Sequence, residues 1–181
     1  MASDKDHILT ERLLLRPPLP EDFDGWAEFQ ADPVQTRFVG GAQERAAAWR
    51  SFCTMAGAWT IRGYAMFSMI ERSSGKWIGR TGPWYPEGWP DQEIGWGVLS
   101  SHAGKGYATE AAAASMDYVF DVLGWERVIH CIDPENFSSQ KVAERLGSRN
   151  LGQTRMPAPY QDLPVDAWGQ NAAEWKARSG R

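Results

Sequence analysis

One short segment, residues 99–111, joins a run of apolar residues to two closely spaced glycines and then to an alanine-rich helical pattern. A strand that ends in such a turn and restarts as a helix directs several unpaired main-chain N–H groups, and the positive end of the helix dipole, toward one point. Gly104 and Gly106 can adopt positive φ, and without a Cβ they let a ligand approach the main chain closely. The segment therefore predicts a phosphate-binding turn; a plain helix N-terminus with small residues is the alternative.

Two other phosphate-binding motifs fit this segment poorly. A P-loop needs Ser or Thr directly after its Gly-Lys pair, whereas Gly106 follows Lys105 here, so a magnesium ion would lack its hydroxyl ligand. The dinucleotide-binding fingerprint needs a third glycine, and Thr109 occupies that position. Both motifs are set aside.

The size and charge of the chain narrow its class. Its 181 residues suit one domain, with 43% hydrophobic and 23% charged residues as in an ordinary globular protein. We expect a single domain over residues 1–181 with a frayed tail after about residue 175. The formal charge of −4 argues against a nucleic-acid surface. The negative charge slightly favours a cationic or amine substrate, although net charge mainly affects solubility.

Cysteine, histidine and hydropathy patterns point to a cytoplasmic protein without metal. Cys53 and Cys131 have no C-x-x-C spacing, so free thiols in a reducing compartment are expected. His7, His102 and His130 are far apart and match no metal-ligand pattern. The polar, acidic N-terminus and the lack of a long apolar run predict no membrane association.

Periodicity and turn residues predict the elements along the chain. We expect helices at residues 20–32, 43–60, 108–123 and 136–146, the last of them ending before Gly147. In the helix from Gln43 to Thr60, the apolar residues that recur at intervals of three and four are Ala46, Ala47, Trp49, Phe52, Cys53 and Ala56. We expect strands at residues 8–16, 64–71, 77–81, 91–99, 127–132, 151–156 and 163–168. Residues 83–90 hold three prolines and are expected to form a loop. Strand, helix, strand and helix over residues 91–147 form a βαβ pattern, which predicts a parallel pair of strands.

Two motifs in this βαβ region resemble one family. Residues 104–111, Gly-Lys-Gly-Tyr-Ala-Thr-Glu-Ala, resemble the acetyl-CoA pyrophosphate loop of the GNAT N-acetyltransferase superfamily. Residues 133–139, Asp-Pro-Glu-Asn-Phe-Ser-Ser, followed by Leu146-Gly147, resemble its N-x-x-S helix start and closing leucine-glycine. The opening Leu9-Thr10-Glu11-Arg12 resembles the branch that includes ribosomal-protein-alanine N-acetyltransferases, so the similarity spans nearly the whole chain.

The resemblance implies a fold, and at two positions this sequence departs from the motifs of the family. The expected fold is α/β (α+β), with a mixed, mostly antiparallel sheet of about seven strands, a splayed central parallel pair and flanking helices. Ala103 stands where the family motif usually has Gln or Arg, so main-chain donors must suffice at the phosphates. Ser148 stands where an aromatic residue commonly follows leucine-glycine.

The resemblance also assigns a cofactor site, with acetyl-CoA as co-substrate. Main-chain groups of the splayed strand, at Val98, Leu99 and Ser100, would pair with the pantetheine arm, and Asn136 would also bind that arm. The pyrophosphate would be held by Ala103, Gly104, Lys105, Gly106, Tyr107, Ala108 and Thr109. Tyr107 is read as a packing residue beside this loop, and Lys105 either adds charge near phosphate or points into solvent.

Two residues are candidates for the chemistry that the resemblance implies, the direct transfer of an acetyl group to an amine. Glu93 would accept the amine proton through water; an exposed strand position or a salt-bridge partner is its alternative. Ser139 matches the motif serine and would protonate or solvate the leaving sulfur; helix capping is its alternative.

The acceptor is left open by the sequence. Trp84, Tyr85 and Trp89 are candidates for the wall of its pocket, because rigid rings on a loop suit substrate enclosure. A protein N-terminus, a free amino acid, a polyamine or an aminoglycoside would each present an amine. A noncatalytic acyl-CoA sensor or interaction domain on the same scaffold is the competing hypothesis, and homodimerisation is compatible with either.

Overall fold

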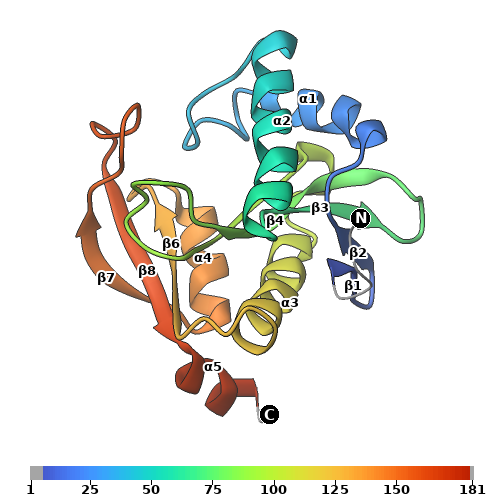
Figure 1. The fold of residues 1–181 in the computed structure, drawn as a ribbon. Coiled ribbons are helices and arrows are strands. Elements are labelled where there is room, and N and C mark those ends of the chain that lie inside the picture. The colour runs from blue at the N-terminus through green and yellow to red at the C-terminus, as the bar shows by residue number, and fades with distance from the viewer. Residues whose placement is uncertain (1–5, 180–181) are drawn as a thin grey trace.

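A computed structural model describes residues 6–179 of the chain. One eight-stranded sheet runs through it in the order β1-β2-β3-β4-β5-β6-β8-β7 (Figure 1). The strands are β1 Ile8–Leu9, β2 Leu13–Arg16, β3 Phe67–Glu71, β4 Trp77–Trp84, β5 Glu93–Val98, β6 Arg127–Ile132, β7 Arg149–Thr154 and β8 Val165–Asn171. The helices are α1 Phe23–Ala31, α2 Arg45–Arg62, α3 Tyr107–Asp121, α4 Phe137–Leu146 and α5 Ala172–Ser179, with 3-10 turns η2 Pro20–Asp22 and η3 Ser100–His102.

Neighbouring strands are antiparallel except β5 and β6, which are parallel and lie in the middle of the sheet. The crossover between them is α3, as the βαβ pattern predicts. The expected mixed, mostly antiparallel sheet with a central parallel pair is therefore confirmed.

Two helical layers cover the two faces of the sheet. Successive residues of a strand point to opposite faces: Trp77 packs in the hydrophobic cluster with α1 and α2, and its neighbour Ile78 packs in the cluster with α3. Figure 1 shows α1 beside α2 and α3 beside α4. Each face of the sheet thus has its own core, and the two strands of the parallel pair lie between them.

The prediction of one strand over residues 8–16 is wrong in one respect, because this segment forms a hairpin of two strands, β1 and β2. The N–H of Thr10 donates to the carbonyl oxygen of Leu13 at 2.9 Å, and the Thr10 hydroxyl oxygen accepts from the Leu13 N–H at 2.9 Å. These bonds close a turn between β1 and β2. The sheet therefore has eight strands instead of about seven.

The expected loop at residues 83–90 begins later than predicted, because β4 continues through Pro83 to Trp84. Proline is tolerated at this point since β3 begins at Phe67, opposite Thr81, and Pro83 lies beyond its end. On its other side Pro83 is opposite Ile94 of β5. Trp84 is consequently a strand residue and not a loop residue.

The predicted apolar face of one helix also needs correction. In α2 the buried residues are Ala48, Phe52 and Met55, whereas Trp49 and Cys53 are exposed, so the helix packs through a narrower stripe than its apolar residues suggest. Helix α5 continues past Trp175 to Ser179. Buried Trp175 anchors it by donating from Nε1 to Asp117 Oδ1 at 2.9 Å. Residues 180–181 lie outside the described residues.

The other predicted elements are confirmed to within a few residues at their ends. Within residues 6–179, no helix combines the length and the apolar character that crossing a bilayer requires. Among those same residues, His, Cys, Asp and Glu form no group of three or more that could hold a metal ion.

Candidate active site

The glycine turn after β5 has the backbone conformation that the sequence predicts. Gly104 has φ of 75° and Gly106 has φ of 85°, and Gly106 is the N-cap of α3. Residues 103–106 are exposed, while Tyr107 is buried against the core. The first turn of the 15-residue helix α3 therefore presents its free N–H groups to solvent beside a main chain that a ligand can approach closely.

A side-chain cluster holds this turn against the β1–β2 hairpin. Arg12 donates from Nε to Glu110 Oε2 at 2.6 Å and from Nη1 to the carbonyl oxygen of Lys105 at 2.9 Å. Thr10 donates its hydroxyl to Glu110 Oε1 at 2.6 Å, and the Arg12 guanidinium lies 4.3 Å from the centre of the Tyr107 ring. Sequence reasoning used Thr10 and Arg12 only as family markers, and it did not assign them this supporting role.

Strands β5 and β6 separate soon after they meet. Their one paired position is Glu93 opposite Ile129, where the Ile129 N–H donates to the carbonyl oxygen of Gln92 at 2.8 Å. In a parallel ladder the next bond would join the Cys131 N–H to the carbonyl oxygen of Ile94. Both groups are instead bound to side chains, so the strands open from this point toward their C-terminal ends.

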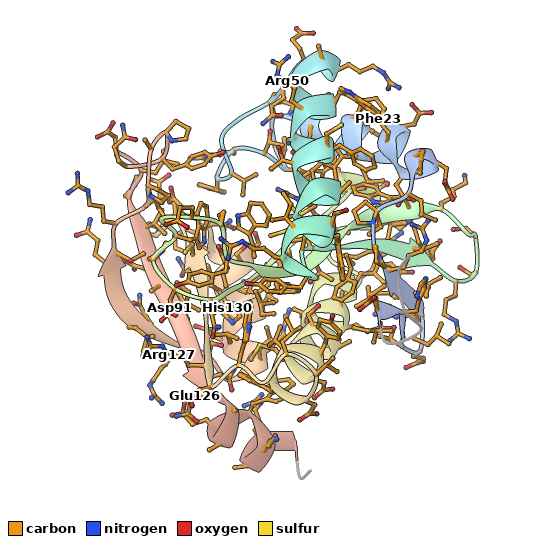
Figure 2. The ribbon with its side chains drawn as sticks, viewed as in Figure 1. Phe23, Arg50, Asp91, Glu126, Arg127 and His130 are labelled. Carbon is orange, nitrogen blue, oxygen red and sulfur yellow. The ribbon has the colours of Figure 1, made fainter. Side chains whose placement is uncertain are left out.

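Those two side chains belong to Glu93 and His130. The Cys131 N–H donates to Glu93 Oε1 at 2.9 Å. His130 Nδ1 lies 2.8 Å from the carbonyl oxygen of Ile94, and its Nε2 lies 2.9 Å from the hydroxyl of Ser148. His130 is buried in the interior (Figure 2), and burial lowers its pKa to about 4, so the ring is neutral and Nδ1 carries the proton that the carbonyl accepts.

Glu93 is itself a buried carboxyl group at the edge of this opening. Its Oε2 accepts a hydrogen bond from Trp89 Nε1 at 2.5 Å. Burial raises the pKa of Glu93 to about 7, against the hydrogen bonds from Cys131 and Trp89, which lower it. A carboxyl group with this pKa can take up and release a proton near neutral pH.

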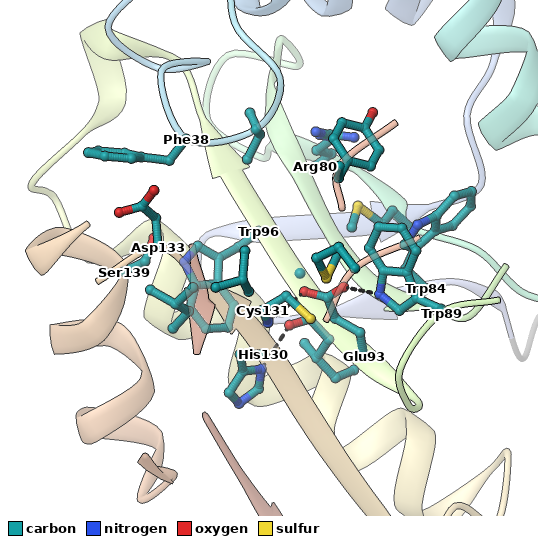
Figure 3. A pocket seen from close by; sticks show the side chains of 18 of the residues that line it. Phe38, Arg80, Trp84, Trp89, Glu93, Trp96, His130, Cys131, Asp133 and Ser139 are labelled. Atoms are coloured by element: carbon teal, nitrogen blue, oxygen red, sulfur yellow. Dashed lines mark hydrogen bonds between the residues drawn. The ribbon is translucent and has the colours of Figure 1, made fainter. Parts of the chain in front are cut away.

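A cavity of about 370 Å³ lies between the sheet and the α1/α2 layer, and Glu93 lines it (Figure 3). Trp84 and Trp89 also line this cavity, together with residues of α1, α2 and the β7–β8 loop. Tyr85 lines a neighbouring hollow, with which the cavity shares the Trp84 side chain as a wall. The structure therefore brings two of the three predicted acceptor-wall rings to Glu93.

Comparison with known proteins decides the family. A family model described as an acetyltransferase (GNAT) domain matches residues 12–149, which is most of the chain. The chain belongs to the GNAT acetyltransferase family.

Similar proteins agree with this assignment. A protein of Bacillus licheniformis named uncharacterized N-acetyltransferase p20 is 30% identical over 155 residues, which are 82% of this chain and 85% of that protein. The crystal structure of an acetyltransferase from Agrobacterium tumefaciens is 31% identical, with a TM-score of 0.79 over 91% of this chain and 93% of that one. A ribosomal-protein-S5-alanine acetyltransferase from Vibrio fischeri, at 17% identity, shares the fold with a TM-score of 0.72 over 94% of this chain and 98% of that one.

The second GNAT motif reaches the same cavity from α4. Asn136 and Ser139 both line it (Figure 3 labels Ser139). The cap of α4 is Asn136, whose Oδ1 accepts from the Ser139 N–H at 3.2 Å and from the Ser138 hydroxyl at 2.8 Å. Ser139 thus contributes its N–H to the capping bond, and its hydroxyl is not the capping group.

At the end of β5, the main-chain N–H and C=O groups of successive residues point alternately toward β4 and toward β6. The Leu99 N–H donates to the carbonyl oxygen of Ile78 at 2.9 Å and so points toward β4. Alternation then directs the main-chain groups of Trp96 and Val98 toward the opening beside β6. The Ser100 hydroxyl donates to Asp32 and accepts from Gln35 Nε2 at 3.0 Å, which ties this end of β5 to the α1–α2 loop.

Three residues of this site were missed by sequence reasoning: Arg80, His130 and Cys131. Arg80 carried a usable signal, because arginine inside an apolar strand is seldom buried without a partner. His130 and Cys131 lie in a correctly predicted strand, but their contacts to Ile94 and Glu93 depend on the pairing of β5 with β6.

Proposed function

We propose that this GNAT family member transfers an acetyl group from acetyl-CoA directly to a primary amine of a protein N-terminus or a small molecule. The observation that carries the proposal is the buried carboxyl group of Glu93, whose pKa is raised to about 7 where β5 and β6 separate. It shares one cavity with Ser139, Trp84 and Trp89. A proton acceptor, a hydroxyl donor and an enclosing wall are thus present together.

Acetyl-CoA supplies an activated thioester to this site. We assign its diphosphate to Ala103, Gly104, Lys105, Gly106, Tyr107, Ala108 and Thr109, where the first turn of α3 offers N–H groups. The opening beside β5 is assigned to the pantetheine arm, with main-chain pairing at Val98 and Trp96 and additional contacts from Leu99, Ser100 and Asn136. Side chains that occupy the Cys131 N–H and the Ile94 carbonyl keep this opening free of ladder bonds.

In the transfer step, the neutral amine nitrogen attacks the thioester carbon, so that a C–N bond forms and the C–S bond breaks. Glu93 accepts the proton that the nitrogen loses, through a water molecule. The hydroxyl of Ser139 donates a proton to the departing sulfur and recovers one from water. Glu93 then releases its proton to water, so the net change is one proton moved from nitrogen to sulfur, and no covalent enzyme intermediate is formed.

The test is the release of free CoA from acetyl-CoA in the presence of peptides with free N-termini, amino acids, polyamines and aminoglycosides. CoA is best followed by chromatography, because exposed Cys53 would consume a thiol reagent. We expect release with at least one amine class, and its loss in Glu93→Gln, which keeps the acceptor oxygen for the Cys131 N–H. Calorimetric binding of acetyl-CoA without release by any amine would refute the transferase proposal and support the noncatalytic sensor.

A further inference from the structure

Arg80 is a half-buried cation of the cavity, and the charge of Glu93 acts on it without a hydrogen bond or ion pair between the two side chains. It extends from β4, opposite Gly97 of β5, and lines the cavity together with Glu93 (Figure 3). Its Nε is buried and has no hydrogen-bond partner in the described part of the chain. No carboxylate within residues 6–179 forms an ion pair with it.

Other partly buried arginines of this protein are satisfied. Arg16 forms a two-pronged pair with Asp22, with Nη1–Oδ2 and Nη2–Oδ1 distances of 2.7 and 2.8 Å. Arg12 is paired with Glu110. Of the five N–H donors of a guanidinium, a buried one left without an acceptor is costly, and in Arg80 this is the Nε–H. Arg80 therefore differs from Arg12 and Arg16, whose guanidinium groups each have a carboxylate partner.

Contacts with aromatic rings offset only part of the free-energy cost of removing the Arg80 guanidinium from water. The Arg80 guanidinium carbon lies 4.9 Å from the centre of the Trp26 ring and 5.6 Å from that of Phe29. Such contacts stabilise the charge but accept no hydrogen bond in the plane of the guanidinium. Burial lowers the pKa of Arg80 to about 10, so it remains charged at neutral pH.

The other charged residues that line the cavity accept their hydrogen bonds from groups other than Arg80. Glu93 receives the Cys131 N–H and the Trp89 indole, and Asp133 Oδ1 receives the Glu135 N–H at 2.8 Å. The planar donors of Arg80 match the oxygen spacing of a carboxylate or phosphate. A ligand with such a group would supply the partner that the protein does not.

We propose that Arg80 binds an acidic group, a carboxylate or a phosphate, of the acetyl acceptor. The acceptor is then an amine that also carries an acid, with its nitrogen directed to Glu93 and its acid to Arg80. This inference rests on the proposed acetyl transfer. Acceptors that carry only positive charge, such as polyamines and aminoglycosides, are disfavoured because they offer Arg80 no hydrogen-bond acceptor and would place a further cation beside it.

The experiment compares amines that differ only in the acid. Amino acids are assayed against their carboxamides, and 2-aminoethyl phosphate against ethanolamine, with CoA release as the readout. We expect the acidic member of at least one pair to have a kcat/KM roughly 30-fold higher or more, as for the loss of one partner of a buried charge pair. The two pairs distinguish carboxylate from phosphate. Equal rates within both pairs, or faster transfer to the uncharged members, would overturn the proposal.

Variants of Arg80 locate the effect. In Arg80→Met the preference for the acidic member should fall to within about threefold, and in Arg80→Lys it should be partly retained, since charge remains but the planar fork is lost. Arg50→Met is the matched control, because Arg50 is exposed on α2 (Figure 2). A higher KM for acetyl-CoA in Arg80→Met, with an unchanged acceptor preference, would contradict the assignment to the acceptor.

A binding measurement separates this inference from acetyl transfer itself. With CoA in place of acetyl-CoA no turnover occurs, and calorimetry then compares the same acid and non-acid pairs on the wild-type protein. Tighter binding of an acid without turnover in the assay would retain the Arg80 site and refute the transferase proposal. CoA release from amines without an acidic group alone would support the transferase proposal and refute the Arg80 site. Far-ultraviolet circular dichroism and thermal unfolding identify an Arg80 variant that has lost its fold.

Discussion

Trp89 donates its indole N–H to Glu93 Oε2 at 2.5 Å, from the loop just before the strand that carries Glu93. The other carboxylate oxygen accepts the Cys131 N–H from the opposite strand. Each carboxylate oxygen can accept a second hydrogen bond. Glu93 is therefore held from both sides and can still accept a proton from a water in the cavity.

The pH dependence of turnover should follow Glu93. Because its pKa is raised to about 7, kcat/KM should rise as pH increases through about 7, when the carboxylate forms. Glu93→Gln should remove this inflection and lower kcat roughly 100-fold or more. In Trp89→Phe, a donor that stabilises the carboxylate is lost, so the inflection should move to higher pH. A Glu93→Gln enzyme with full kcat at every pH would exclude Glu93 as the base.

Folding stability should show two opposed pH dependences from Glu93 and His130. Between pH 4.5 and 6.5 the folded state holds the Glu93 proton that the unfolded state releases, so acidification stabilises the fold. Over the same range the unfolded state protonates His130 and the folded state does not, since its pKa is lowered to about 4, so acidification destabilises the fold. The two contributions should nearly cancel in the wild type.

Single variants should expose each contribution. Urea unfolding at pH 7.5, 6.0 and 5.0 should show Glu93→Gln losing stability on acidification and His130→Asn gaining it. Each slope approaches about 1.4 kcal/mol per pH unit within the window. Parallel pH dependences in the two variants would contradict the assigned shifts.

Arg12 should affect the binding of CoA but not of the acceptor. It ties the carbonyl of Lys105 to Glu110, and losing a charged hydrogen bond there should loosen the turn. We expect Arg12→Met to weaken CoA binding roughly 10-fold by calorimetry, with the acceptor KM unchanged. Arg50→Met serves as the exposed control, and equal CoA affinity in the two variants would remove Arg12 from the support of the turn.

Gly57 and Gly104 form a matched pair of sites for testing the backbone conformation of the glycine turn, which contains Gly104. A Cβ at Gly57, inside α2, and a Cβ at Gly104 would each meet nothing within 4 Å, but Gly104 alone of the two has a positive φ, 75°. Gly57→Ala should stabilise the protein by about 0.5–1 kcal/mol, and Gly104→Ala should destabilise it by about 1 kcal/mol. Thermal unfolding measures both, and a shift of the same sign in the two variants would contradict this reading.

Local signals predicted the βαβ region well. Strand β6 has the predicted bounds, and α4 ends before Gly147, whose φ of 87° is a common helix stop. The two glycines of the turn also have the expected φ, because this property depends on few neighbours. The family resemblance also named Glu93 and Ser139 as candidates, and both line one cavity.

Long-range contacts were not predictable in the same way. The sequence left Glu93 open as an exposed residue, and its burial depends on the α1/α2 layer and on Trp89 folding back over it. Which face of α2 is buried depends on α1, against which it packs, and not on its own periodicity. The missing partner of Arg80 is likewise a property of the assembled cavity.

The separation of β5 from β6 makes the sheet two half-sheets joined by a seam. One half runs from β1 to β5 and the other from β6 to β7, and along the seam a single ladder position and a few side chains connect their strands. A molecule with amide groups that lies in the seam would act as an additional strand between the halves. Amide hydrogen exchange at the inner edges of both halves should therefore slow together when the seam is filled.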